Sequence, residues 1–144
     1  MRNLIFEPEY GASGAMRRLL SALVALCAAA SQAHAIDARL KSGLLKLDPN
    51  TRLEQRCDAE LLDRIARDSA EYRPDKVVAY ATATPNIQGD EIKTRGGAFR
   101  SKGQWYHIDF KCETAPDHMT VLSLRYRIGD EIPEDAWSKY NLWP

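Results

Sequence analysis

The sequence predicts an α+β fold: one long N-terminal helix packed on a four-stranded antiparallel meander, followed by a short C-terminal helix or turn. Two patterns lead to this prediction. Apolar residues recur every four positions over residues 53–65, which is the spacing of one helix face. From residue 76 onward, apolar and polar residues alternate, as they do in half-buried strands. Strands joined in sequence by short turns tend to pair as antiparallel neighbours.

The helix is expected to begin near residue 48. Asp48 can cap it with Pro49 in the first turn, or Thr51 and Glu54 can form a capping box. The apolar stripe consists of Leu53, Cys57, Leu61 and Ile65. The helical pattern stops before Pro74, which closes the segment.

Four strands are expected after the helix, at residues 76–84, 91–101, 105–113 and 118–129. Gly96-Gly97 suggests a bulge or a bend in the second strand. In the third strand the apolar face carries Tyr106, Ile108, Phe110 and Cys112, and the outer, solvent-facing side carries Trp105, His107, Asp109 and Lys111. In the fourth, a shared face carries Leu122, Leu124, Tyr126 and Ile128.

The last thirteen residues, 132–144, offer Pro133 at a helix start and are interpreted as a short helix or turn docked on the core. Trp137 is expected to cap the core, and Trp143 to stay exposed. The predicted order of elements is that of cystatin-like folds, a comparison that says nothing about function.

The N-terminal segment has the pattern of a secretory signal peptide over residues 16–35. Arg17 and Arg18 supply the positive start, residues 19–30 an apolar run, and residues 33–35 an A-x-A cleavage site. This run of 12 residues is too short for the ~20 that span a bilayer. We therefore expect cleavage before Ile36.

The signal peptide divides the chain into three segments: residues 1–15, 16–35 and 36–144. Residues 1–15 are expected to be a misassigned start or a disordered leader, and residues 36–144 a single periplasmic or secreted domain. The mature segment holds 17 Lys or Arg and 18 Asp or Glu, a balance that predicts no general attraction to nucleic acid. No apolar run after the signal approaches the length of a membrane span.

Signal cleavage leaves two cysteines, Cys57 and Cys112. An exported chain with an even cysteine count is expected to pair them in its oxidising compartment. Each sulfur lies on the apolar face of its predicted element, so a bridge would tie helix to sheet. A catalytic or metal-binding thiol remains the alternative, although neither cysteine has a histidine within four residues. No metal or other cofactor is predicted.

The candidate ligand surface is the outer face of the sheet. It combines cations with an aromatic residue and a histidine: Lys93, Arg95, Arg100, Trp105, His107 and Asp109. Nearby acidic residues make an ordinary solvated, mixed-charge face the competing interpretation. His107 and Asp109 share one side of a strand and can form an acid–base pair, but no nucleophile motif accompanies them. His118 is interpreted as a turn residue.

Three stretches, "LDPNTRLEQRCDAELLDRI", "GGAFRSKGQWYHIDFKCE" and "GDEIPEDAW", resemble one family. It is the family of bacterial exported proteins catalogued as domain of unknown function 930, and the resemblance covers residues 44–137. The resemblance implies an exported location and a shared cysteine pair matching Cys57 and Cys112. It implies no activity and no catalytic residue.

The sequence therefore favours a small exported binding or interaction module over an enzyme. Its expected partner is an unknown periplasmic protein or cell-envelope component. The alternative is an envelope hydrolase or other enzyme using His107 and Asp109, and a third class is a structural or envelope-stress component. The sequence names no ligand and no oligomeric state.

Overall fold

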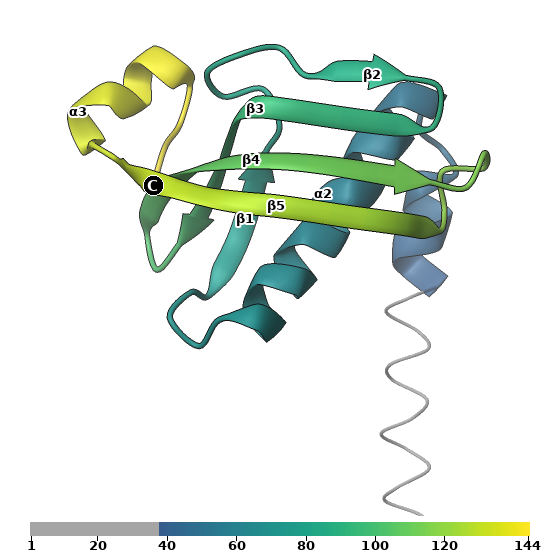
Figure 1. Ribbon diagram of the computed structural model, residues 1–144, viewed down its shortest axis with the longest axis horizontal. Coiled ribbons are helices and arrows are strands. Elements are labelled where there is room, and N and C mark those ends of the chain that lie inside the picture. The colour runs from purple at the N-terminus through teal and green to yellow at the C-terminus, as the bar shows by residue number, and fades with distance from the viewer. Residues whose placement is uncertain (1–37) are drawn as a thin grey trace, which may run out of the picture. The chain divides into compact units, whose positions relative to one another are not determined.

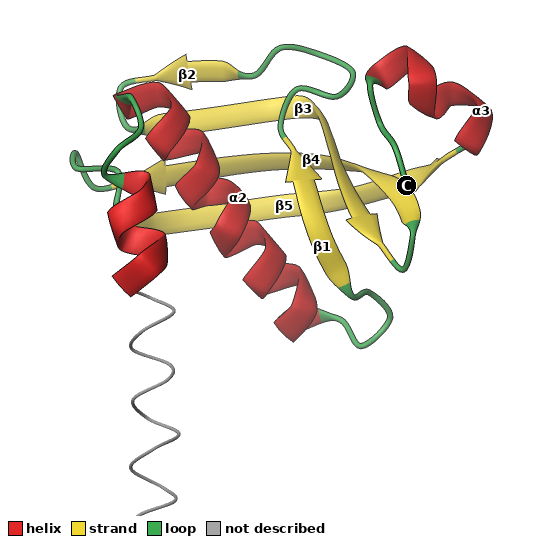
Figure 2. Ribbon diagram, turned by 180° about the vertical axis from the view of Figure 1, so that it is seen from behind, coloured by secondary structure: helices red, strands yellow, loops and turns green. Residues whose placement is uncertain are grey.

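Helix α2 lies diagonally across one face of an antiparallel sheet (Figure 2). The computed structural model describes residues 38–144, so the predicted signal peptide and leader lie outside the described residues. The elements in chain order are α2 (Pro49–Asp68), β1 (Pro74–Val78), β2 (Asn86–Gln88), β3 (Glu91–Ser101), β4 (Gln104–Thr114), β5 (Val121–Ile132), α3 (Glu134–Trp137) and the 3₁₀ turn η1 (Ser138–Tyr140). The predicted α+β class is confirmed (Figure 1).

The sheet has the order β1-β3-β4-β5, with β2 added beside β3. β1 pairs with the end of β3 and β2 with its start, so both short strands share one edge of β3. The prediction of one strand over residues 76–84 is wrong in its bounds, because β1 covers only Pro74–Val78. The chain leaves the sheet after Val78, and Thr94 Oγ1 then donates to the carbonyl of Ala79 at 2.6 Å.

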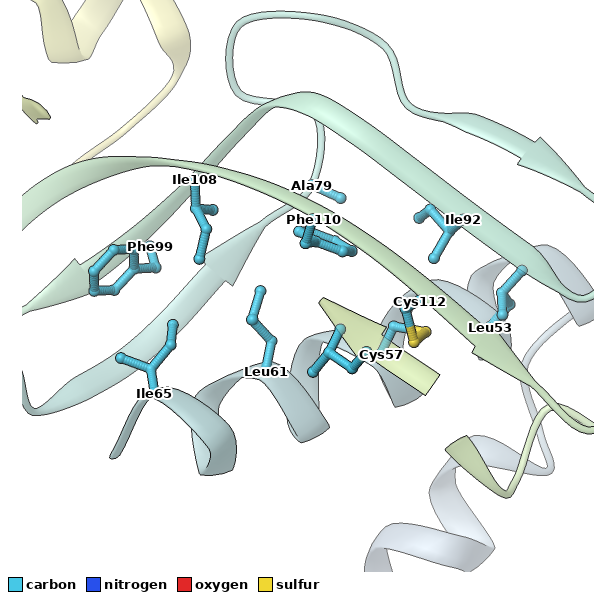
Figure 3. Packing of buried hydrophobic residues seen from close by; sticks show 11 residues of the cluster. Leu53, Cys57, Leu61, Ile65, Ala79, Ile92, Phe99, Ile108, Phe110 and Cys112 are labelled. Atoms are coloured by element: carbon cyan, nitrogen blue, oxygen red, sulfur yellow. A yellow bond between two sulfur atoms is a disulfide. The ribbon is translucent and has the colours of Figure 1, made fainter. Parts of the chain in front are cut away.

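The start of α2 follows the first of the two capping arrangements considered. The Asp48 carboxylate accepts a hydrogen bond from the Thr51 backbone N–H at 3.1 Å, and Pro49 occupies the first turn. The whole apolar stripe of the helix is buried, and it packs on Ile92, Phe99, Ile108, Phe110 and Cys112 of the strands (Figure 3). Burying each large side chain stabilises the fold by about 1.5–3 kcal/mol.

A disulfide bond joins Cys57 of α2 to Cys112 of β4, as predicted (Figure 3). Their Cα atoms are 6.1 Å apart, within the range that an undistorted bridge spans. Both sulfurs are buried in the main core, between helix and sheet. The bridge therefore fixes the helix to the strand that pairs with both β3 and β5.

A second apolar cluster lies on the other face of the sheet, away from α2. Its buried members are Ala98, Trp105, Ile132, Trp137 and Leu142. The prediction that Trp105 faces solvent is wrong, since only 1% of its surface is exposed. Strand alternation does turn it away from the helix, but the segment after β5 folds back and covers it. Trp137 caps this cluster, and Trp143 is 56% exposed, as expected.

Bulges interrupt the regular pairing of the long strands. Arg95 and Gly96 of β3 together stand opposite one residue, Asp109, which confirms the irregularity expected from the glycine pair. Gly129 and Asp130 of β5 stand opposite His107 in the same way. Each bulge changes which alternate residues face α2.

A further register shift overturns one expectation for β5. Leu122 does not share the buried face with Leu124; it is 62% exposed, and Val121 packs on the core instead. The extra residue at this point reverses the alternation, which a pattern of apolar side chains alone cannot reveal.

The start of α2 is tied to its surroundings by long polar side chains. Arg52 donates to the carbonyls of Leu44 and Leu47, and Arg56 donates to the carbonyl of Met119 in the β4–β5 turn. These bonds satisfy carbonyls that regular secondary structure leaves open.

His118 lies in the β4–β5 turn with a positive φ of 57°. It is more than a turn residue, because its ring is buried. Nδ1 lies 2.7 Å from the Pro49 carbonyl, and Nε2 lies 3.0 Å from an Asp90 carboxylate oxygen. The imidazole thus joins the start of the helix to the β2–β3 turn.

One buried acid in α2 has no compensating contact. Asp58 is 7% exposed, and its Oδ1 has no hydrogen-bond partner among the described residues. Burial raises the pKa of its carboxyl to about 8, and the negative charge of Glu54 adds to the rise. Asp58 is therefore mostly protonated at neutral pH.

The disulfide generates the first prediction. Its loop of 55 residues implies a stabilisation of about 4 kcal/mol through restriction of the unfolded chain. Reduction should lower the urea midpoint by a corresponding amount, and the Cys57→Ala/Cys112→Ala variant should have the same low midpoint with or without reductant. Two titratable thiols in the folded, oxidised protein would contradict the bridge.

Asp58 generates the second prediction. Its pKa is higher in the folded chain than the ordinary value of 3.8, so folding favours the protonated form and stability falls as pH rises from about 4 to 8. Each unit of pKa difference is worth about 1.4 kcal/mol. Asp58→Asn should therefore be more stable than the natural chain, by a margin that grows across this range.

Chemical denaturation at a series of pH values measures that margin. The matched control is Asp63→Asn, which changes an exposed acid on the same helix. A margin for Asp58→Asn that does not vary with pH would show that the Asp58 carboxyl is already ionised in the folded chain.

Candidate functional site

The face of the sheet away from α2 carries a group of cations, here called the basic surface. Its members are Lys93 and Arg95 of β3, Lys111 of β4, and Arg125 and Arg127 of β5. Lys93 pairs with Lys111, and Lys111 pairs with Arg125, so three cations lie directly opposite one another across three strands. All five, with Asp109, line one open depression that also includes Thr94, Phe110 and Tyr126.

Acidic neighbours neutralise only part of the basic surface. Lys111 Nζ lies 2.8 Å from a carboxylate oxygen of Glu91, and the Arg127 guanidinium lies 2.6 Å from that of Asp109. The other three cations, Lys93, Arg95 and Arg125, form no ion pair with any of residues 38–144. The depression therefore has an excess of positive charge that nothing in the described chain balances.

The sequence pattern found part of this surface. Lys93 and Arg95 were predicted as ligand residues and Lys111 was placed on the outer side of its strand, whereas Arg125 and Arg127 were missed. The sequence pattern did contain a sign of these two arginines. Over residues 124–128 the even-numbered residues of β5 are the less exposed ones, so the odd-numbered arginines point away from α2. The missing information was the register that places Arg125 beside Lys111.

His107 and Asp109 lie in an adjoining depression with Arg95, Arg127, Gly129 and Asp130. Each of the two residues stands opposite a bulge. A side chain at position 129 would place its Cβ 3.0 Å from the Cβ of His107, so the glycine leaves the imidazole room. Bulges commonly re-aim side chains beside binding and catalytic sites.

The chemistry available in this depression is limited. The Asp109 carboxylate is engaged by Arg127, and the His107 imidazole makes no hydrogen bond with the rest of residues 38–144. The residues that line it supply no hydroxyl or thiol, and neither Ser123 nor Tyr80 is among them. The pair can position or bind a ligand, but a ready nucleophile does not accompany it.

Arg100 and Trp105, the remaining predicted residues, lie elsewhere on the same face. Arg100 forms two hydrogen bonds with the Asp75 carboxylate, at 2.9 and 3.0 Å, and these bonds lower the pKa of Asp75. The indole N–H of Trp105 donates to the carbonyl of Trp143 at 3.0 Å. Both side chains thus anchor the C-terminal segment and do not join the basic surface.

Beside that anchor is a hollow of about 270 Å³, here called the aromatic pocket. Residues from β1, the β1–β2 loop and the C-terminal segment surround it: Lys76, Tyr80, Trp105, Tyr140, Asn141 and Trp143. The sequence pattern did not group these residues, because they come from distant parts of the chain.

Two general findings apply to the part of the chain that the structure describes. No group of three or more His, Cys, Asp or Glu side chains in residues 38–144 is arranged to hold a metal ion. None of the helices there combines the length and apolar character needed to cross a membrane.

Comparison with known proteins adds one result. No curated protein and no solved structure matches the chain. The family model described as Domain of Unknown Function (DUF930) matches residues 44–142, which include the disulfide, the basic surface and most of the aromatic pocket. Since the match covers more than half of the chain, this protein belongs to the DUF930 family.

Proposed function

We propose that this domain is an exported binding module that takes an anionic ligand on the basic surface. One observation carries the proposal: Lys93, Lys111 and Arg125 lie directly opposite one another across β3, β4 and β5. Like charges in direct cross-strand positions destabilise a sheet. A bound anion would remove that repulsion.

The side chains in the depression suit phosphate or carboxylate groups. Arginine can present two N–H groups to such an anion, and Arg125 has no competing acid among the described residues. Phe110 and Tyr126 border the depression, but their side chains pack toward α2, so the cations supply its chemistry. The ligand class is thus a phosphate- or carboxylate-bearing component of the cell envelope.

Export to the periplasm or beyond is part of the same proposal. It is supported by the signal-peptide pattern at residues 16–35 and by the buried Cys57–Cys112 bridge, since disulfides persist mainly in oxidising compartments.

The alternative is an envelope hydrolase or other enzyme in which His107 and Asp109 act as acid and base. Their shared depression and the room that Gly129 leaves beside His107 favour it. The Arg127–Asp109 ion pair and the lack of a hydroxyl or thiol in that lining favour binding instead. Hydrolysis of an envelope polymer by the pure protein, lost in His107→Ala, would establish the enzyme.

The third prediction concerns the basic surface. Lys93→Gln/Arg125→Gln should weaken binding of inorganic polyphosphate by at least about tenfold, since two charge-assisted contacts are lost. Binding by the natural chain should also weaken as salt is raised. Calorimetry measures both effects, and a parallel assay with phosphatidylglycerol vesicles distinguishes a lipid headgroup from a soluble anion.

The matched control is Lys46→Gln/Lys102→Gln, which removes the same charge from exposed positions outside the depression. It should bind polyphosphate and vesicles as the natural chain does. The Lys93→Gln/Arg125→Gln variant should be as stable as the natural chain or a few tenths of a kcal/mol more stable, because repulsion is relieved. Equal weakening in both double variants would mean that only net charge matters, and the proposed site would be wrong.

The fourth prediction concerns export. Sequencing the N-terminus of protein recovered from the periplasm should give Ile36 as the first residue. Recovery with Met16 still attached would show that the segment is not cleaved.

A further inference from the structure

The aromatic pocket brings together rings from two distant segments of the chain. Tyr80 comes from the β1–β2 loop, and Tyr140 and Trp143 come from the segment after β5; in Figure 2 this loop and α3 lie at the same end of the sheet. We propose that this pocket binds one pyranose ring of a glycan, with the sugar in contact with both Trp143 and Tyr80. This ligand differs from the anion proposed above and binds at different residues.

Trp143 is held in place while its ring stays exposed. The backbone N–H of Leu142 donates to the Trp137 carbonyl at 2.9 Å, and the Leu142 side chain is buried. The Trp143 carbonyl accepts from the Trp105 indole at 3.0 Å and from Arg100 at 3.5 Å. A fixed backbone with an exposed indole is already organised for a ligand, so little ordering entropy is lost on binding.

Tyr80 is presented in a similar way from the opposite side. The residue is 61% exposed, yet the backbone on both sides is fixed to β3. The Ala79 carbonyl accepts from Thr94, and the Thr82 N–H donates to the Gly96 carbonyl at 2.8 Å. Close packing of Ala83 on Gly96 leaves no space for a side chain at position 96 and fixes the loop further.

The charges around the pocket select the kind of occupant. Lys76 Nζ lies over one face of the Trp143 ring, 5.8 Å from its centre, so a sugar would contact the indole beside this ammonium group or on the other face; the residues lining the pocket include no carboxylate. A cationic ligand would be repelled, although aromatic cages often bind cations. The C–H face of a neutral sugar instead suits the negative face of an aromatic ring.

Size and polarity agree with a single sugar ring. The volume of about 270 Å³ lies below the ~300–1,000 Å³ typical of pockets for drug-sized ligands. Asn141, the tyrosine hydroxyls and Lys76 supply hydrogen-bond donors and acceptors at the rim for sugar hydroxyl groups. A proline-rich peptide also docks on aromatic residues, but it requires an extended groove.

The fifth prediction tests this pocket by calorimetry of the natural chain with three probes. They are a neutral glucose oligomer, an N-acetylglucosamine oligomer and a proline-rich peptide. At least one oligosaccharide should bind saturably at millimolar concentration. Trp143→Ala and Tyr80→Ala should each weaken that binding about tenfold or more, the scale of one lost stacking contact.

The matched control is Leu122→Ala, which removes an equally exposed apolar side chain from the start of β5. It should leave oligosaccharide binding unchanged, and thermal unfolding should show that all three variants fold. Failure of both sugars to bind, or binding that survives Trp143→Ala and Tyr80→Ala, would overturn the proposal, as would binding of the peptide alone. Lys93→Gln/Arg125→Gln should leave sugar binding unchanged, so this result is separate from the test of the basic surface.

Discussion

The covalent bond between Cys57 and Cys112 is the constraint from which the rest of the arrangement follows. It fixes α2 to β4, the strand that pairs with both β3 and β5. Because neighbouring strands in register share their inward and outward sides, fixing one face of β4 fixes the same face of the others. The basic surface and the aromatic pocket both lie on the side that the helix cannot reach.

That outer face has a covered part and an open part. At one end the segment after β5 covers Trp105, while the cations of β3, β4 and β5 stay open to solvent. On the opposite face of the sheet, the stretch "RLEQRC" of α2, which is part of the family resemblance, has a structural role. Arg52 and Arg56 satisfy loop carbonyls, and Cys57 forms the bridge. These three residues therefore stabilise the fold.

The sequence predicted the fold well where the spacing of residues within one element decides the structure. The helix start at Asp48, the bounds of β3 and the Cys57–Cys112 bridge all follow from spacing and capping chemistry. It predicted the site only in part, because a site depends on register and on distant segments. The residues around Trp105 in the sequence do not indicate that Leu142 covers it. Those around Tyr80 do not indicate that it shares a pocket with Trp143. The same limit explains why Arg125 was missed beside Lys111.

The bulge at Arg95 and Gly96 has a consequence for how the chain can vary between relatives. Ile92 and Phe99 are an odd number of positions apart, yet both are buried against α2. In a regular strand one of them would point away from the helix. Losing a single residue at the bulge would restore regular pairing with β4 and leave Phe99 facing α2, whereas losing two would turn Phe99 toward solvent. A relative that lacks the bulge can therefore keep the same buried face with one residue fewer, but the rest of the spacing between Ile92 and Phe99 cannot change by one without exposing a core side chain.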